Sequence, residues 1–181
     1  MIQADESISL EFLEQEHAEP LLKLVHDNRM YLREWLPWVD FMLTAENSAS
    51  YIADCKRRAA AKTDFAYAIM FEGKMVGRIG MHHVNQQNKI GEIGYWLAEG
   101  LQGKGIVIKC CAALINYGFT DLGLNRIEIK CGTSNHRSRG IAEKLKFKTE
   151  GILRQAELLN GTFIDLYLYS MLKEEWGKVK F

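Results

Sequence analysis

The stretch IGYWLAEGLQGKGIVIKC, residues 93–110, holds two apolar runs separated by three closely spaced glycines. Dense glycines are typical of a loop, so the first run predicts the end of a strand and the second the start of a helix. Free backbone N–H groups at the start of such a helix favour an anion. A tight strand-to-helix turn without a ligand is the alternative, and these residues alone leave both open.

Length, composition and charge limit the class of protein. The 181 residues fit one domain, which we assign to residues 1–181. Hydrophobic residues make up 48% and charged residues 25%, as in ordinary globular proteins. Lys plus Arg and Asp plus Glu are equal at 23 each, so no global basic field indicates a nucleic-acid partner.

The cysteines and the N-terminus indicate the compartment. Cys55, Cys110, Cys111 and Cys131 lack CxxC spacing, and a bridge between the adjacent pair is unfavourable. We interpret them as reduced thiols of a cytoplasmic protein. The first residues, MIQADESISLEF, do not resemble a signal peptide. No run of about 18 apolar residues predicts a membrane span, so we expect no membrane partner.

Hydrophobic periodicity predicts alternating strands and helices. Strand-like runs lie at 7–12, 65–71, 75–84, 90–98, 125–131, 149–159 and 162–172. Helical spacing appears at 19–36, 45–62, from 104 to 123, and within 133–147. We expect Pro37 to stop the first helical region, Gly123 to be the C′ residue of the third helix, and a Ser or Asn cap on the fourth. Asn160-Gly161 is a strong hairpin signal.

This order of elements predicts an α/β domain of the α+β type, with a mixed, mostly antiparallel sheet and flanking helices. The helix that follows the glycine loop connects the strand at 90–98 to the strand at 125–131. Such a crossover normally makes the two strands parallel neighbours.

Two common phosphate motifs do not fit the glycine loop. A P-loop needs Lys followed by Ser or Thr after its last glycine, whereas Gly105 is followed by Ile106 and Val107. The dinucleotide fingerprint fits Gly103 and Gly105 but meets Ile108 in place of its third glycine.

The loop instead resembles the acetyl-CoA-binding segment of the GNAT N-acetyltransferase superfamily, whose motif is R/Q-x-x-G-x-G/A. Gln102 and Gly105 match this motif, and Val107 departs from its final small residue. The segments LREWLPW, LGLNRIEIKCGTSNHRSRGIAEKLKF, EGILRQAELLNG and DLYLYSML are similar to the RimJ/RimL branch, which acetylates protein N-termini. The resemblance covers most of the chain and implies a single GNAT-like domain with a splayed parallel strand pair.

This resemblance implies a set of donor-binding residues. The pyrophosphate of acetyl-CoA is expected on the loop, and its pantetheine arm between the splayed strands. The residues implied are Gln102, Gly103, Lys104, Gly105 and Ile106 for the pyrophosphate, and Tyr95, Trp96, Leu97 and Asn135 for pantetheine. Backbone N–H groups near Trp96 and Leu97 are expected to polarise the thioester carbonyl. No metal is implied.

The chemistry is attack of a neutral amine on a thioester. At pH 7 deprotonation costs about 1 kcal/mol for an α-amine and about 4.6 kcal/mol for Lys. An N-terminal amine therefore needs only a modest base. By the resemblance, Glu157 matches the proposed base and Ser138 the hydroxyl on the thiol side, with a hairpin carboxylate and a helix cap as the alternatives. Glu92, on the splayed strand, is a rival base.

Other reactive residues fit less well. Strand alternation is expected to point His82 and His83 to opposite faces, which argues against a shared metal. Cys131 lies on the inward face of a predicted strand and fits the core better than a nucleophile. The aromatic residues Tyr31, Trp35 and Trp38 are candidates for an acceptor cleft, for packing or for contacts in a homodimer.

Three functions remain open. An acetyltransferase for a protein or peptide N-terminus of the ribosomal-protein type fits best. The alternatives are acetylation of a small amine such as a polyamine or aminoglycoside, and a non-catalytic acyl-CoA-binding sensor. The presence of both Ser138 and Glu157 favours an enzyme over the sensor.

Overall fold

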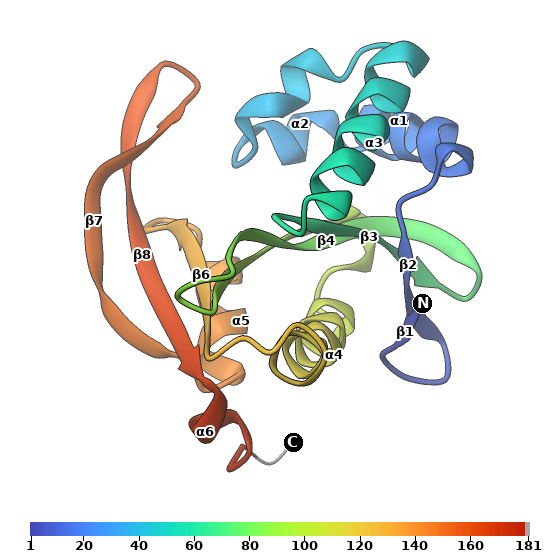
Figure 1. Cartoon of the computed structure of the whole chain (residues 1–181). Helices are drawn as coiled ribbons and strands as arrows, with labels where there is room; N and C mark the ends of the chain where they lie inside the picture. The colour runs from blue at the N-terminus through green and yellow to red at the C-terminus, as the bar shows by residue number, and fades with distance from the viewer. Residues whose placement is uncertain (180–181) are drawn as a thin grey trace.

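One eight-stranded sheet organises the fold, with the strand order β1-β2-β3-β4-β5-β6-β8-β7 (Figure 1). A computed structural model describes residues 1–179 of the chain. The strands are β1 (Ile2–Gln3), β2 (Ile8–Phe12), β3 (Phe65–Phe71), β4 (Lys74–Asn85), β5 (Ile90–Leu97), β6 (Arg126–Gly132), β7 (Lys148–Leu159) and β8 (Thr162–Leu172). Every neighbouring pair is antiparallel except β5 and β6, which confirms the predicted mixed sheet.

Helices cover both faces of the sheet (Figure 1). They are η1 (Gln15–His17), α1 (Ala18–Asp27), α2 (Arg29–Arg33), η2 (Pro37–Phe41), α3 (Ala45–Ala60), η3 (Glu99–Leu101), α4 (Ile106–Thr120), α5 (His136–Lys144) and α6 (Lys173–Trp176), where η marks a 3-10 helix. α1, α2 and α3 lie on one face, and α4 and α5 on the other. The buried residues divide in the same way: Leu114 and Ile127 belong to the α4 side, whereas Val25 and Ile52 belong to the α1 and α3 side.

The parallel pair β5–β6 is short. Helix α4 connects the two strands, and the predicted parallel, neighbouring arrangement is confirmed. Only Ile90–Glu92 of β5 pair with Arg126–Glu128 of β6. Beyond Glu92 the strands separate, so the splayed pair that the family resemblance implied is also confirmed. The rest of β5 remains paired with β4 on its other side.

Two predicted helix boundaries were wrong. The region 19–36 is divided at Asn28, whose side-chain amide donates to the Leu24 carbonyl and ends α1. Helix α4 ends at Thr120, and its C-cap is Asp121. Gly123 therefore lies two residues beyond the cap, in the turn that leads to β6, where its φ of 64° suits glycine.

Both predicted hairpins are present. Glu72-Gly73 joins β3 to β4 with φ values of 50° and 74°, and Asn160-Gly161 joins β7 to β8 with 49° and 81°. Positive φ at both central residues is the conformation of a type I′ turn. Asn160 has a second role, because its side-chain amide donates to the Arg33 carbonyl at 2.9 Å. This bond joins the tip of the β7–β8 hairpin to the end of α2.

Gly77 permits the close approach of β4 to β5. A Cβ at this position would lie 2.3 Å from the backbone carbonyl oxygen of Trp96. We expect Gly77→Ala to lower the free energy of unfolding by about 1–3 kcal/mol, because one strand must shift. Gly140→Ala in α5 is the control, since its Cβ would meet no atom of the described residues within 4 Å. Urea unfolding measures both; a Gly77→Ala protein as stable as wild type would contradict the argument.

Candidate active site

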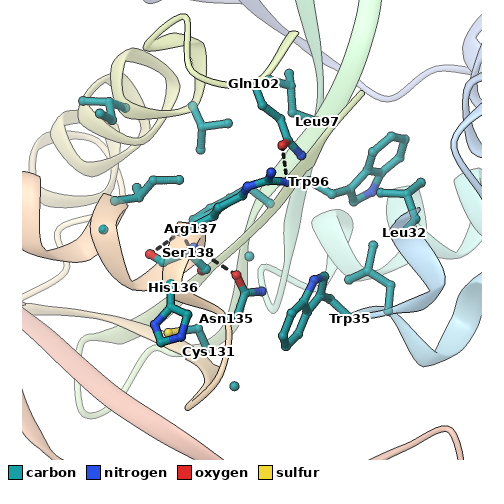
Figure 2. Close-up of a pocket in the computed structure, with 18 of the residues that line it drawn as sticks. Leu32, Trp35, Trp96, Leu97, Gln102, Cys131, Asn135, His136, Arg137 and Ser138 are labelled. Atoms are coloured by element: carbon teal, nitrogen blue, oxygen red, sulfur yellow. Dashed lines mark hydrogen bonds between the residues drawn. The ribbon is translucent and has the colours of Figure 1, made fainter. Parts of the chain in front are cut away.

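A cavity of about 740 Å³ lies where β5 and β6 separate (Figure 2). Its walls come from β5, the glycine loop with the start of α4, α5, α2 and the β7–β8 hairpin. Most of the predicted site residues line it, namely Tyr95, Trp96, Leu97, Gln102, Gly103, Gly105, Ile106, Asn135, Ser138 and Glu157. Lys104 is exposed and lies outside this lining. Residues that were predicted from the sequence, and that lie far apart along the chain, thus line one cavity in the fold.

The glycine loop is built to receive an anion. Gly103 and Gly105 have φ values of 77° and 76°, and Gly105 is the N-cap of α4. The Lys109 N–H donates to the Gly105 carbonyl at 3.2 Å, which leaves the amides of Ile106 and the next two residues free of the helix itself. The positive end of the helix dipole adds to these donors. Together they are suited to a phosphate group.

The open edge of β5 offers backbone hydrogen-bonding groups. The Ala98 N–H donates to the Val76 carbonyl of β4 at 2.8 Å, and the Trp96 carbonyl also faces β4. Because backbone groups alternate sides along a strand, those of Tyr95 and Leu97 face the gap beside β6. An extended ligand can pair with such an edge as an added strand.

The start of α5 forms the opposite wall. The side-chain oxygen Oδ1 of Asn135 accepts the Ser138 N–H at 3.1 Å and caps the helix, as Figure 2 shows. The hydroxyl groups of Ser138 and Tyr95 lie 2.9 Å apart. Burial raises the pKa of Tyr95 well above its ordinary value, so its phenol stays protonated. Cys131 lines the cavity but is buried, and burial raises the pKa of its thiol, which does not suit a nucleophile.

Arg137 was missed by the sequence prediction. It lies in the first turn of α5, lines the cavity, and donates from Nη1 to the Gln102 side-chain oxygen at 2.5 Å (Figure 2). This contact joins α5 to the glycine loop and places a positive charge beside the anion site. The only sequence signal was its place two residues after the cap Asn135.

Glu157 reaches the cavity because β7 bulges just before it. Residues 154–156 of β7 lie opposite the single residue Asp165 of β8, whose carboxylate accepts the Gln155 N–H at 2.8 Å. A bulge re-aims the side chains that follow it. Burial raises the pKa of Glu157, and the negative charge of Glu92 raises it further. A carboxyl group with a raised pKa is a stronger base.

The rival carboxylate Glu92 is held by an ion pair. Its Oε2 accepts from Lys130 Nζ at 2.7 Å, and both side chains are partly buried. Lys130 lines the cavity, whereas Glu92 is not among the lining residues. Of the two candidate bases, Glu157 is therefore the one with access to the cavity.

The two histidines lie apart from the site. His83 has a φ of 50° in an irregular segment of β4, so the strict strand alternation expected there was wrong, and the ring centroids are 6.4 Å apart. His82 Nδ1 lies 2.9 Å from Asp64 Oδ1. Burial and the charge of Arg78 lower the pKa of His82 to about 4, so it is neutral at pH 7. Among residues 1–179, no three His, Cys, Asp or Glu side chains are grouped to hold a metal.

The three aromatic candidates divide between two environments. Tyr31 and Trp35 line the cavity, as an acceptor cleft requires. Trp38 lines a separate cavity and lies against Trp96, with ring centroids 6.1 Å apart.

Comparisons with known proteins agree with this geometry. The family model for the acetyltransferase (GNAT) domain matches residues 8–148. The chain is 35% identical over 173 residues to "Putative ribosomal N-acetyltransferase YdaF" of Bacillus subtilis (strain 168), covering 95% of this chain and 94% of the relative. It is 33% identical over 174 residues to the ribosomal-protein-serine acetyltransferase of Escherichia coli (strain K12), covering 94% and 96%.

A solved structure is similar over the same length. It is RimL, the ribosomal L7/L12 alpha-N-protein acetyltransferase, in complex with coenzyme A. The TM-score is 0.91 at 27% identity, covering 94% of this chain and 97% of that one. The chain belongs to the GNAT acetyltransferase family, with RimJ/RimL-like relatives. It is an acetyl-CoA-dependent N-acetyltransferase, as the sequence predicted.

The glycine loop gives a direct test of donor binding. We expect Gly105→Glu to weaken coenzyme A binding strongly, because a carboxylate in the loop repels pyrophosphate and blocks the amides. Calorimetric titration of coenzyme A measures this. Gly105→Ala carries the same left-handed strain without the charge, and Gly100→Glu places the charge outside the cavity lining. Affinity equal to wild type in Gly105→Glu would contradict the loop as the pyrophosphate site.

Proposed function

We propose that the protein transfers an acetyl group from acetyl-CoA to the N-terminal amine of a protein or peptide. One observation carries the proposal: a single cavity extends from the free amides of α4, past the open edge of β5, to the partly buried Glu157. Donor-binding groups and a base thus share one space. The activities named for the two relatives, both of ribosomal-protein type, support the same class of acceptor.

The donor lies along the backbone groups of the cavity. Its pyrophosphate binds the amides from Gly103 to Ile106, with the charge of Arg137 nearby. Pantetheine pairs with the open edge of β5 at Tyr95. The Leu97 N–H faces the gap and stabilises the oxyanion that forms on the thioester carbonyl.

The reaction removes one proton from the amine and cleaves the carbon–sulfur bond of the thioester. Glu157 accepts the amine proton, directly or through water, as nitrogen attacks the thioester carbon. The carbon–sulfur bond then breaks and releases coenzyme A as a thiolate, which accepts a hydrogen bond from Ser138. Tyr95 retains its own proton and orients the Ser138 hydroxyl.

The acceptor side of the cavity is bordered by α2 and the β7–β8 hairpin, and in our proposal the end of a chain enters between them. A Cβ on Gly132 would lie 3.3 Å from the Trp35 ring and 3.5 Å from the Ile164 side chain. These three residues line the space between α2 and the β7–β8 hairpin. The hydrogen bond from Asn160 to the Arg33 carbonyl joins the two sides of this space at the hairpin tip. An extended N-terminus can enter this space end first, so the rest of the acceptor chain need not pass through it.

We retain a cytoplasmic location as part of the proposal. All four cysteines are free and buried, which fits a reducing compartment. Within the described residues, no helix combines the length and the apolar character needed to cross a membrane. Ribosomal proteins, the acceptors of the type that we propose, are present in the cytoplasm.

Acceptor choice tests the proposal directly. We expect a short peptide with a free α-amine to be acetylated faster near neutral pH than its N-terminally blocked, Lys-containing counterpart, because the α-amine is more often neutral. Thiol release from acetyl-CoA measures both rates, with spermidine and an aminoglycoside as the small-amine arms. Faster transfer to the blocked peptide or to a small amine would overturn the assignment of the acceptor.

Removing the base should lower the rate in a pH-dependent way. We expect Glu157→Gln to lower the rate by about 10²–10⁴-fold near neutral pH with little change in acetyl-CoA affinity. The wild-type rate should fall as pH drops through the raised pKa of Glu157, because the carboxylate becomes protonated. The deficit of the variant should shrink above the pKa of the acceptor amine, where solvent supplies neutral amine.

A pH–rate profile with one peptide acceptor measures this for wild type, Glu157→Gln and Glu92→Gln. A deficit that is constant with pH would assign Glu157 to acceptor binding. A deficit confined to Glu92→Gln would assign proton transfer to β5.

A further inference from the structure

A second cavity, of about 510 Å³, lies between α3, η2 and β4. Its lining mixes aromatic, polar and charged residues: Trp38, Phe41, Met42, Asn47, Ser50, Tyr51, Arg58, Asp64 and Arg78. These residues differ from those of the active-site cavity. The contact between Trp38 and Trp96 separates the two spaces, because each ring lines one of them.

Arg78 is the unusual group in this cavity. It lies on β4 and is partly buried, and its Nε is buried with no hydrogen-bond partner among residues 1–179. Its guanidinium carbon lies 5.6 Å from the centre of the Tyr51 ring. Within those residues no carboxylate lies within ion-pair distance of it. A partly buried cation without a counter-ion is unfavourable, and an anion in the cavity would compensate it.

The other charges around the cavity leave Arg78 uncompensated. Arg58 bonds Asp54 through Nη1, and its Nε lies 3.9 Å from Asp64, beyond hydrogen-bond distance. The other oxygen of Asp64 is 2.9 Å from the ring of His82. The Asp64 carboxylate is thus engaged by His82 and Arg58, and among the described residues Arg78 is left without a carboxylate partner.

We propose that this cavity binds a small molecule that carries an oxyanion, a carboxylate or a phosphate, on an aromatic body. The planar fork of Arg78 matches two oxygens of such a group. Trp38, Tyr51 and Met42 supply an apolar wall for the ring. The site goes beyond acetyl transfer, because none of these residues belongs to the active-site lining.

The second cavity lies next to the active-site cavity. Arg78 is the direct cross-strand partner of Trp96 on β5. A ligand held by Arg78 therefore rests one strand away from the thioester position, against the far side of the Trp38–Trp96 contact.

The test is a binding titration in the presence of saturating coenzyme A, so that the active-site cavity is occupied. Phenyl phosphate and phenylacetate are the two oxyanion probes, and benzyl alcohol is the uncharged probe. We expect saturable binding of one or both oxyanions and much weaker binding of benzyl alcohol. Ligand-observed NMR measures all three. The stronger of the two probes identifies phosphate or carboxylate as the group recognised.

Variants locate the binding. We expect Arg78→Gln to weaken it about tenfold or more, the loss of one charge-assisted hydrogen bond. Arg78→Lys keeps the positive charge but lacks the planar fork, so its affinity for the oxyanion should lie between those of wild type and Arg78→Gln. Arg57→Gln is the matched control, since Arg57 is a neighbouring, mostly exposed arginine outside the lining. Absence of binding, displacement by coenzyme A, or equal affinity in wild type and both Arg78 variants would overturn the proposal, whatever the acetyl acceptor proves to be.

Discussion

The separation of β5 from β6 after Glu92 is the constraint on which the site depends. A continuous parallel ladder would satisfy the backbone groups of β5 and close the sheet. Because the ladder stops at Glu128, the backbone of Leu97 is left facing a gap, and the gap becomes the cavity. The sheet remains intact around this opening, since β5 stays paired with β4 and β6 with β8. The ligand site is thus formed by a local interruption of an otherwise regular sheet.

The two halves of the site rest on different chemistry. The donor half uses backbone groups, from the start of α4 and the edge of β5, which any sequence of suitable conformation provides. In the function that we propose, the acceptor half uses side chains near the end of α2 and on the β7–β8 hairpin, such as Trp35 and Glu157, which line the cavity. Backbone recognition suits a constant donor, whereas side chains can vary with the acceptor. This division allows one donor site to be combined with different acceptors.

The donor half was the more predictable part because its signals are local. Gly103 and Gly105 indicate a loop and a helix start within a few residues, and the order of strands and helices along the chain follows from hydrophobic periodicity. Arg137 was missed because its contact with Gln102 joins segments 35 residues apart. The bulge that aims Glu157 depends on pairing with β8, and local pattern carries no signal for it. The boundaries at Asn28 and Gly123 were displaced because local bonds that hydrophobic periodicity does not show end those helices: Asn28 to the Leu24 carbonyl, and the Leu122 N–H to the Tyr117 carbonyl.

Trp96 lies at the boundary between the two cavities: it lines the active-site cavity and contacts Trp38, which lines the second one. Its backbone is fixed against Gly77 of β4, so the strand cannot shift without breaking that close approach. Its ring lies between the active-site cavity and Trp38, and its Nε1 is buried with no hydrogen-bond partner among the described residues. An indole N–H without an acceptor is costly to bury. A small rotation of this ring toward an acceptor on either side would change the wall that both cavities share. Trp96 thus combines a rigid backbone with an unsatisfied side chain at the boundary between the two cavities.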